Sequence, residues 1–514
     1  MITSIIPVVD LFAGPGGLSE GFSSYISKDK KSIFKVVASV EMDTFAHKTL
    51  ELRSFFHEFS RGEVPEAYYK YLRGQIERDT LFEKYSKQSE AAKKRAIKAT
   101  LGTSDDEMIY RKIQDAINPY KGKDWVLVGG PPCQAYSNIG RARRQANGQG
   151  MEKQQQDTRN FLYLEYLKII EKFKPSVFVM ENVPGMLTSV INGSRIFDKI
   201  KEDLKHPSRA VGNENGLEYK IYSLVSGLSS VDSPSDFIIH AEDYGIPQAR
   251  HRVILLGVRS DIDKKPDTLE KLKTNVLLRQ VISDLPKLRS SFSKNDDTLL
   301  EWKIYLDSIP KQNWFKELNN TKDGTIVRKE LVKIIPNIKI HLTTGGRFIS
   351  GKAKPEYRPL WFFDGRIGGF LNHEARGHIK EDLSRYLFSA VFAQMFGHSP
   401  VMRNYPPSLL PKHKNIDQAL LNGKFGDRFK VQVAEKPAST MTCHISKDGH
   451  YIIHYDPLQC RSLTVREAAR VQTFPDNYYF EGPRTAQYHQ VGNAVPPLLA
   501  LQIANVVSKV IHNS

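Results

Sequence analysis

The sequence predicts an α/β protein with a doubly wound, mostly parallel central sheet and a second, smaller mixed α/β domain. Up to about residue 258, short apolar strands alternate with helical patterns. These strands are continuous and rich in β-branched residues, which is typical of strands covered on both faces. From about residue 260 to 460 the alternation is lost. A chain of 514 residues also exceeds one compact core, so two domains are expected.

Six strands are expected in the first part of the chain. They are Ile5–Phe12, Val36–Val40, Trp125–Val128, Val177–Met180, Ile221–Val225 and Val253–Val258. Between two of them, Phe161, Leu164 and Leu167 recur at helical spacing. Residues 55–124 are polar and interrupt the alternation, so we expect a helical, charged surface insertion there.

The change in composition divides the chain into three segments. Residues 1–258 are expected to form the first domain and residues 259–461 the second, while residues 462–514 return to the first domain. Within the second domain the pattern predicts a helix near Asp382–Phe392, with Leu383, Tyr386, Leu387 and Ala390 on its apolar face, and a hairpin around Lys447-Asp448-Gly449.

Composition restricts the classes of protein. The formal net charge of +17 favours a polyanionic partner, most often nucleic acid, although a well-solvated basic surface is the alternative. No apolar run is long enough for a membrane span, and the start lacks the pattern of a secretory signal. Three cysteines cannot form a disulfide framework and suggest a reducing, cytoplasmic compartment.

A cofactor site is indicated by VVDLFAGPGGLSEGF, residues 8–22. Asp10 ends a strand, and the glycines that follow, Gly14 and Gly16 among them, allow a ligand close to the backbone at a helix N-terminus. The next strand ends at Glu41, where an acid accepts hydrogen bonds from a ribose diol. The pattern favours an adenosine-containing cofactor and leaves NAD and S-adenosylmethionine open.

Three further strand ends carry chemically active side chains. Cys133 follows Pro131 and Pro132, which restrict the backbone and aim the thiol; a buried small hydrophobe is the alternative for a lone cysteine. Glu181 follows the strand FVM, at the same predicted sheet edge. Arg250 and Arg252 alternate in QARHR, which leads into the last strand, so we expect them to face one side together.

In this order, DLFAGPGGLSEGF, GGPPCQ, ENVPGM, QARHR, REAARVQTFPD and QVGNAVPP resemble the sequence blocks of the cytosine-5 DNA methyltransferases of bacterial restriction–modification systems. The resemblance spans the chain except for residues 55–124 and much of 260–430. It implies that S-adenosylmethionine is the methyl donor, that residues 1–258 form the catalytic and cofactor-binding domain, and that residues 259–461 form a target-recognition domain.

The resemblance also implies residue roles. Cys133 would add to carbon 6 of the target cytosine, Glu181 would bind the ring N3 and exocyclic amine, and Arg252, with Arg250, would help to hold the base. The implied cofactor residues are Asp10, Phe12, Gly14, Gly16, Glu41, Met42, Pro132, Asn493 and Val495. The acid that contacts the adenine amine in the family has no clear counterpart, and Asp105, Asp106 and Glu107 are its candidates.

A basic loop follows Cys133. Residues 138–159 carry five basic and two acidic side chains with several glycines, so we expect the loop to close on DNA phosphates around an extruded base, an ordinary flexible loop being the alternative. The residues expected to contact DNA are Gln134, Ser137, Arg141, Arg143 and Arg144. In the second domain, TTGGRF, RNYPPSLLPKHKN and KPASTMTCHI are expected to face DNA.

No metal is expected. Cys443, His444, His450 and His454 superficially suggest zinc, but their spacing matches no usual zinc module, and we expect His450 and His454 to share one face of a strand. Methyl transfer from a sulfonium also requires no metal.

Other functions remain open at this point. A tRNA cytosine-5 methyltransferase of the same superfamily usually lacks so large a second domain, and a catalytically inactive DNA-binding relative usually loses the PPC or ENV residues. An NAD enzyme with a catalytic cysteine leaves QARHR and QVGNAVPP unexplained. The sequence therefore predicts a cytoplasmic, monomeric enzyme that acts on double-stranded DNA, without a membrane, and works alongside a cognate restriction endonuclease.

Overall fold

The computed structural model describes most of the chain, which folds into two compact units. The described residues are 5–27, 29–132, 162–191, 194–214, 216–226, 233–293, 297–338, 343–412, 416, 420–421 and 426–512. The first unit comprises Met1–Val64, Asp79–Thr274 and Ala494–Ser514, and the second comprises Pro65–Arg78 and Asn275–Asn493.

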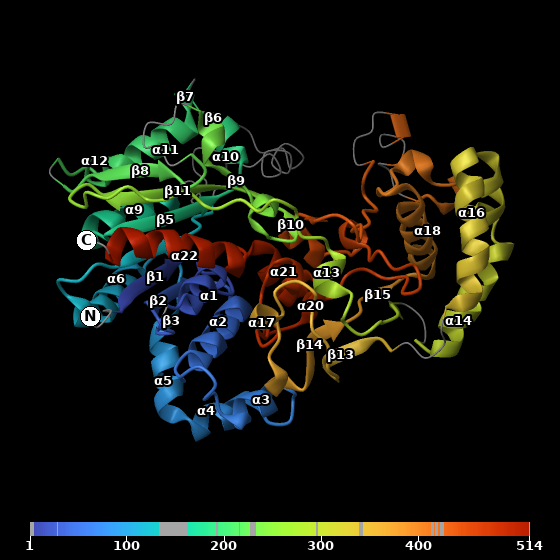
Figure 1. Cartoon of the computed structure of the whole chain (residues 1–514), viewed down its shortest axis with the longest axis horizontal. Coiled ribbons are helices and arrows are strands. Elements are labelled where there is room, and N and C mark those ends of the chain that lie inside the picture. Colours follow the sequence, from blue (N-terminus) through green and yellow to red (C-terminus); the bar gives the residue numbers. More distant parts are fainter. Residues whose placement is uncertain are drawn as a thin grey trace. The chain divides into compact units, whose positions relative to one another are not determined.

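A central sheet forms the core of the first unit (Figure 1). Its strands are β1 (Ile6–Leu11), β2 (Phe34–Glu41), β3 (Ala96–Lys98), β4 (Val126–Gly129), β5 (Val177–Asn182), β8 (Tyr219–Ser223), β9 (Ile238–His240) and β11 (His251–Arg259). The order is β3-β2-β1-β4-β5-β11-β8, with β9 also paired to β11. The first five strands in this order run parallel to one another, whereas β11 is antiparallel to β5, β8 and β9. The predicted mostly parallel α/β sheet is confirmed.

Helices cover both faces of this sheet. They are α1 (Gly17–Ser24), α2 (Thr44–Phe56), α5 (Ser86–Arg95), α6 (Asp106–Ile117), α9 (Leu162–Phe173), α10 (Gly185–Thr188), α11 (Ile196–Lys205), α12 (Pro207–Ala210) and α22 (Pro497–His512). A further helix, α4 (Arg78–Lys84), lies away from the sheet (Figure 1), and its Phe82 stacks on Phe55 of α2. Apolar residues of α6, α9 and α11 share one large core with Val9 and Leu11 of β1. Because strand side chains alternate, Val8 and Asp10 face the other side, where α1 packs against α22 (Figure 1).

The six expected strands are all present, with ends within two residues of the expected ones. The predicted surface insertion at residues 55–124 differs from the structure. β3 pairs with β2 inside the central sheet, and Ile109 and Ile113 of α6 are buried in the main core. Residues Pro65–Arg78, which include α3 (Glu66–Leu72), belong to the second unit. Part of the stretch is therefore core rather than surface.

The second unit is mainly helical, with short strand pairs. Its elements are α13 (Arg279–Ile282), β12 (Ser291–Phe292), α14 (Leu299–Ser308), α15 (Asn313–Glu317), α16 (Lys322–Ile334), β13 (Gly345–Ser350), α17 (Pro359–Phe362), β14 (Gly369–Glu374), β15 (Gly377–His378), α18 (Lys380–Phe396), α20 (Val465–Val471) and α21 (Arg484–Asn493). The expected helix is confirmed as α18, and its four predicted apolar residues are buried. Gly345 and Gly346 of TTGGRF begin β13, which pairs antiparallel with β14.

The chain returns to the first unit later than expected. Residues 462–493, which include α20 and α21, cluster with the second unit, and the first unit resumes only at Ala494. The reason is the packing of α20 and α21 against each other and of α20 against β14. Much of the REAARVQTFPD block therefore supports the second unit.

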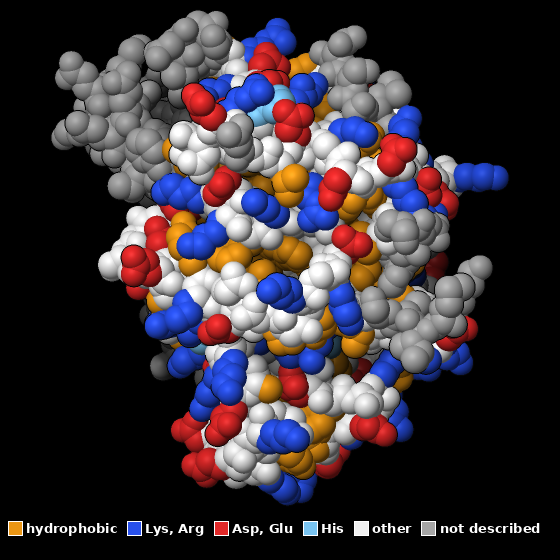
Figure 2. Space-filling model, turned by 90° about the vertical axis from the view of Figure 1, so that its left-hand side faces the viewer, with side chains coloured by type: hydrophobic (Ala, Val, Ile, Leu, Met, Phe, Trp, Pro, Cys, Tyr) orange, Lys and Arg blue, Asp and Glu red, His pale blue; other side chains and the backbone are white. Residues whose placement is uncertain are grey.

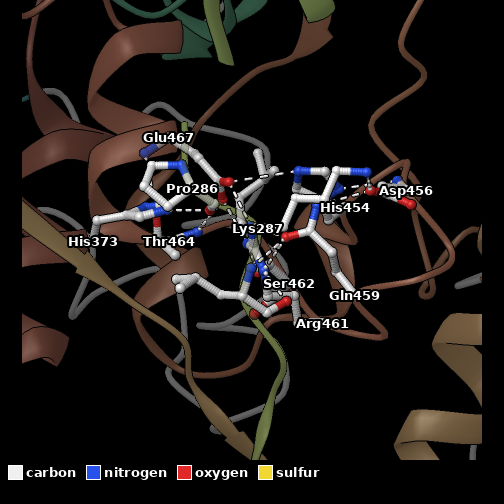
Figure 3. Close-up of polar contacts among 12 residues, drawn as sticks. Pro286, Lys287, His373, His454, Asp456, Gln459, Arg461, Ser462, Thr464 and Glu467 are labelled. Carbon is white, nitrogen blue, oxygen red and sulfur yellow. Dashed lines mark hydrogen bonds and ion pairs between the residues drawn. The ribbon is translucent and has the colours of Figure 1, made fainter. Parts of the chain in front are cut away.

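A buried polar cluster fixes the start of α20 (Figure 3). Arg461 and Glu467 form a two-pronged ion pair at 2.7 Å, and both are almost fully buried. Thr464 caps the helix and accepts from the Glu467 backbone N–H, while the Glu467 carboxylate accepts from Thr464 N–H. Burial alone would raise the pKa of Glu467, but the Arg461 guanidinium beside it holds that pKa well below its usual range.

The predicted hairpin at Lys447-Asp448-Gly449 is wrong. Short 3₁₀ turns, Cys443–Ser446 and His450–Ile452, flank the glycine instead of strands. His450 and His454 consequently do not share a strand face. The Tyr386 hydroxyl lies 2.8 Å from His450 Nδ1, while His454 lies beside Glu467 and accepts from the Asp456 N–H.

One apolar helical stretch, Arg484–Ile511, passes a test of length and composition for membrane crossing, but 78% of its most apolar window is buried inside the protein. Such burial is typical of core helices in proteins that do not cross membranes.

A tight helix contact generates the first prediction. A Cβ on Gly21 of α1 would lie 2.4 Å from Ala500 Cβ and 2.6 Å from the backbone of Leu501. We expect Gly21→Ala to lower the free energy of unfolding by about 1–3 kcal/mol, because the overlap outweighs alanine's helix propensity. Urea denaturation followed by circular dichroism measures this. Gly346→Ala, where a Cβ meets nothing within 4 Å, is the control; equal stability of both variants would contradict the packing.

Candidate active site at the carboxyl edge of the sheet

Four strand ends meet at one edge of the central sheet. Leu11 at the end of β1 is paired with Gly129 at the end of β4, and Gly129 is paired with Met180 of β5. Because β11 runs antiparallel to β5, its first residues lie beside the last residues of β5, with Val253 paired to Asn182. Side chains that are far apart in the sequence are thereby brought to this edge.

Glu181 and Arg252 form an ion pair at this edge. Arg252 Nε lies 2.8 Å from Glu181 Oε1, and the two side chains are only 15% and 14% exposed. A second guanidinium nitrogen of Arg252 donates to the carbonyl of His251 at 2.7 Å, which fixes the orientation of the group. In such a partly dry environment a cation and a carboxylate attract each other more strongly than in water. The predicted proximity of these two residues to one sheet edge is therefore observed.

The turn that precedes Cys133 is tied to the same place. Asn182 Nδ2 donates to the carbonyl of Pro131 at 3.1 Å. A Cβ on Gly130 would lie 3.1 Å from Glu181 Oε2, so a larger residue would crowd the carboxylate. The backbone two residues before Cys133 is thus bonded to the residue after Glu181.

Several predicted residues lie outside the described part of the chain. They are Cys133, Gln134, Ser137, Arg141, Arg143 and Arg144. Their roles stay predictions that rest on the sequence.

Arg250 and Gln248 differ from Arg252 in environment. Both are buried, whereas Arg252 is partly exposed. Gln248 lies in the short strand β10 (Gln248–Ala249), and the Arg250 carbonyl accepts from the Ala241 N–H. Burial of a guanidinium inside the protein is typical of a residue that supports the local backbone, so the role predicted for Arg250 toward the base would be indirect.

The glycine-rich turn after β1 is linked to the end of β2. Glu41 Oε2 accepts from the Gly14 N–H at 2.7 Å, and Oε1 accepts from the Asp43 N–H at 2.7 Å. Burial raises the pKa of Glu41, although these two backbone hydrogen bonds act in the opposite direction. A carboxylate oxygen accepts more than one hydrogen bond, so both oxygens retain capacity for the hydroxyls of a ribose.

Backbone conformation in this turn is unusual. Gly14 and Gly16 have φ of 57° and 97°, and Phe12, a bulky residue, has φ of 56°. Positive φ at a non-glycine residue costs energy and is concentrated at functional sites. A Cβ at Gly14 would meet nothing within 4 Å, so the space beside the turn is open. The turn is therefore strained and faces free volume.

Three other predicted cofactor residues have distinct positions. Met42 follows Glu41 and is 64% exposed, which is unusual for a thioether side chain and consistent with a ligand-covered position. The Val495 carbonyl oxygen would lie 2.1 Å from a Cβ on Gly17, so the backbone of Val495 packs directly against the residue that follows the glycine turn. Pro132 is partly exposed. Asn493 ends α21 in the second unit and its side chain is exposed.

Asp10 lies beneath the turn rather than at its surface. The Ser19 hydroxyl of α1 donates to Asp10 Oδ2 at 2.5 Å, and Oδ1 is buried with no hydrogen-bond partner in the described part of the chain. Burial raises the pKa of Asp10 to about 7, and the Glu41 carboxylate acts in the same direction, against the Ser19 hydrogen bond. Any contribution of Asp10 to cofactor binding therefore passes through the turn above it.

The candidates for the adenine contact follow β3. Asp105 accepts from the Thr100 N–H, and Asp106 accepts from the Gly102 N–H, so both carboxylates hold the turn between β3 and α6. The end of β3 is adjacent to that of β2, because Glu41 is paired with Lys98. The identity of the adenine-binding acid stays a prediction.

Comparison with known proteins identifies this architecture. The family model of the C-5 cytosine-specific DNA methylases matches residues 104–509. A type II methyltransferase of Bacillus paralicheniformis, M.Bpa9945I, is 35% identical over 98% of this chain and 99% of its own length. This chain belongs to the C-5 cytosine-specific DNA methylase family.

One more relative and one solved structure are also similar to this chain. M.DdeI of Desulfomicrobium norvegicum, also a type II methyltransferase, is 25% identical over 98% of the chain and 89% of its own length. A solved structure described as a prophage-encoded DNA modification methyltransferase from E. coli superposes with a TM-score of 0.50 at 18% identity, covering 99% of this chain and 100% of that chain, which supports the fold. The protein is a DNA cytosine-5 methyltransferase.

The glycine turn fits S-adenosylmethionine, the methyl donor that the family implies. The open space beside Gly14, the exposed Met42 and the remaining acceptor capacity of Glu41 suit an adenosine group. Those three residues would hold it, with Phe12 and Val495 beside them. When bound, the donor supplies an electrophilic methyl group on a sulfonium.

Residues that the sequence did not single out complete the methyltransferase site. Ser19 is the partner of Asp10, Gly17 makes room for Val495, and Asn182 anchors Pro131. All three stand within the sequence blocks of the resemblance, and Gly17 and Asn182 directly follow the predicted residues Gly16 and Glu181. What the sequence does not state is which neighbour each one contacts.

The buried Asp10 generates the second prediction. Because its pKa is about 7 in the folded protein and 3.8 as a free side chain, folding favours the protonated form, and the stability associated with it is lost as pH rises from about 4 to about 7. We therefore expect Asp10→Asn to gain stability relative to the unmodified protein between pH 5 and pH 8, by up to a few kcal/mol.

Urea denaturation at pH 5, 6.5 and 8 measures this difference. Asp29→Asn, at an exposed position, controls for the general effect of removing a carboxylate. A difference between Asp10→Asn and the unmodified protein that stays constant with pH would contradict the proposed protonation of Asp10.

Proposed function

We propose that this methyltransferase acts through a transient covalent bond between Cys133 and a cytosine extruded from double-stranded DNA. The observation that carries the proposal is the ion pair between Glu181 and Arg252, at the sheet edge where Asn182 holds Pro131. That arrangement supplies a carboxyl group and a cation beside the backbone that leads to the only cysteine of the GGPPC block.

The chemistry explains why a thiol is needed. Carbon 5 of cytosine is a poor nucleophile because the ring is aromatic and electron-poor. Addition of the Cys133 thiolate to carbon 6 breaks the aromaticity and places electron density on carbon 5, which then accepts the methyl group. Loss of the carbon 5 proton to a base and elimination at carbon 6 restore the aromatic ring and release the thiolate, so all bonds and protons balance.

Glu181 and Arg252 have complementary roles in this scheme. The density that develops in the ring during thiolate addition spreads to N3, where a carboxyl group at Glu181 donates or shares a proton. Arg252 holds Glu181 at 2.8 Å, and we assign to its positive charge a second role, that of favouring the thiolate of Cys133.

The target base must leave the duplex before it reaches these groups, at a cost of about a few kcal/mol. We assign the closing of the site around the extruded base to residues 138–159, whose basic side chains suit DNA phosphates. Gln134, Ser137, Arg141, Arg143 and Arg144 are the residues that we expect to contact DNA.

The second unit is the proposed target-recognition domain. Its exposed basic side chains include Lys352 and Arg358, near the ends of β13 and α17, and Arg347 stacks on the rings of Tyr71 and Tyr479 within 5.0 Å. By contrast, Figure 2 shows a face, on the side of Figure 1 that carries both chain ends, where described Lys and Arg side chains are mixed with Asp and Glu. That mixture is typical of a solvated surface.

The biological setting follows from the type II methyltransferases to which the chain is similar. We infer that the enzyme works as a cytoplasmic monomer and protects host DNA against a cognate restriction endonuclease by methylating the shared target sequence. Methyl transfer itself requires no metal in this scheme.

The covalent bond generates the third prediction. Fluorine at carbon 5 blocks the release step, so the enzyme should become trapped on DNA. We expect a random-sequence duplex made with 5-fluorocytosine to give a protein–DNA species that survives denaturing electrophoresis, and only when S-adenosylmethionine is present. Cys133→Ser should abolish the species.

Cys460→Ser is the matched control, because Cys460 is a free cysteine of the second unit outside the segments that we expect to face DNA. We expect it to retain both the trapped species and methyl incorporation into unmodified DNA. A trapped species formed by Cys133→Ser, or none formed by an enzyme that methylates ordinary DNA, would overturn the covalent mechanism.

A further inference from the structure

Three side chains of the types that bind metal ions lie close together beside the active-site edge. Neither the reaction nor the sequence blocks require a metal ion there. It consists of His240 at the end of β9, Glu242 in the 3₁₀ turn Ala241–Tyr244, and His251 at the start of β11. One donor atom from each side chain lies within 4.8 Å of the other two.

The backbone explains why the two histidines meet. β9 and β11 pair antiparallel with His251 directly opposite His240, so their side chains project from the same face. Their rings stack with centroids 4.0 Å apart and an angle of 29° between planes. The hydrogen bond from Ala241 N–H to the Arg250 carbonyl extends the pairing toward Glu242. The strand ladder thus fixes the spacing of the three residues.

Glu242 has an unused acceptor. Its Oε1 lies 2.8 Å from His251 Nε2, whereas its Oε2 is buried and has no hydrogen-bond partner among the described residues. Leaving a buried carboxylate oxygen unsatisfied costs free energy, so such atoms usually have a proton, a water or a cation beside them. The hydrogen bond to His251 satisfies only one of the two oxygens.

We propose that His240, Glu242 and His251 bind one divalent transition-metal ion, with Zn²⁺ as the matching ion. Two imidazoles and one carboxylate are a common zinc set with a fourth position left for water. Tetrahedral ligands at about 2.0–2.1 Å from zinc are separated by about 3.3 Å. The donor atoms lie within 4.8 Å of one another, so the most distant pair must approach by up to about 1.5 Å. The His240 ring is exposed and the His251 ring is 43% exposed, so both rings have room to rotate and bring their nitrogen atoms closer to Glu242.

The ion would replace the proton that His251 and Glu242 share and would also engage Glu242 Oε2. It would join the β9 end to the β11 start, one residue before Arg252, whose side chain pairs with Glu181. The ion takes no part in methyl transfer. It stabilises the strand from which Arg252 projects. A metal ion at this position differs from the expectation, made from the sequence, that the protein binds no metal.

Metal titration generates the fourth prediction. After chelator treatment and dialysis, isothermal titration of the full chain with Zn²⁺ should give one site per chain, and Zn²⁺ should raise the melting temperature because it binds only the folded form. Co²⁺ bound in the same site should give visible absorption bands that Zn²⁺ abolishes. His251→Ala and Glu242→Gln should each weaken binding more than about tenfold.

His398→Ala is the control, since His398 is exposed and its ring lies against Phe392 and Phe396 rather than against a carboxylate. It should bind Zn²⁺ as the unmodified protein does. Glu242→Gln preserves side-chain size. A circular dichroism spectrum of this variant without metal that matches that of the unmodified protein shows that the variant is folded and that it has lost only the binding of Zn²⁺. Absence of a stoichiometric site in the unmodified protein, or binding that persists in both His251→Ala and Glu242→Gln, would overturn the proposal.

Discussion

The antiparallel pairing of β11 with β5 is the constraint on which the active site depends. Glu181 lies near the end of β5 and Arg252 near the start of β11, and only opposite strand directions bring these two ends together. The resulting contact of 2.8 Å joins residues separated by 70 positions of chain, and Asn182, next on β5, adds the hydrogen bond to Pro131. One register thus positions the acid, the cation and the turn before Cys133, the proposed nucleophile. A shift of one residue would send Arg252 to the other face of the sheet.

Positive charge in this protein has two separate uses. Some of the arginines are internal: Arg461, Arg466 and Arg470 are fully buried, Arg461 pairs with Glu467, and Arg470 pairs with Asp476 and Asp284. Arginines of this kind hold the second unit together and cannot contact DNA. The total of 74 Lys and Arg residues therefore overstates the cations available at the surface, although the acids that pair with the buried arginines are internal as well. The argument for DNA rests on the family and the site rather than on charge alone.

The sequence predicts the first unit well because its signals are local. Continuous runs of β-branched residues mark the strands, and Glu181 and Arg252 could be placed at strand ends from those runs alone. β3 was missed because Ala96–Lys98 is short and follows a highly charged helix, so its burial depends on pairing with β2. The contact of His240 with His251 could not be predicted either, since it depends on the β9–β11 register. In the second unit the polar cluster around Arg461 and Glu467 has no periodic pattern, and residues 462–514 were expected to return to the first domain.

The coupling between Glu181 and Arg252 is the most direct test of the central claim. It is measured from kcat/KM for DNA methylation in Glu181→Gln, Arg252→Ala and the double variant. If the two side chains act as one unit, kcat/KM of the double variant falls by about the same factor as kcat/KM of the more impaired single variant. Arg259→Ala, at the far end of the same strand, should combine with Glu181→Gln without such coupling. Losses for Glu181→Gln and Arg252→Ala that simply multiply would contradict the account.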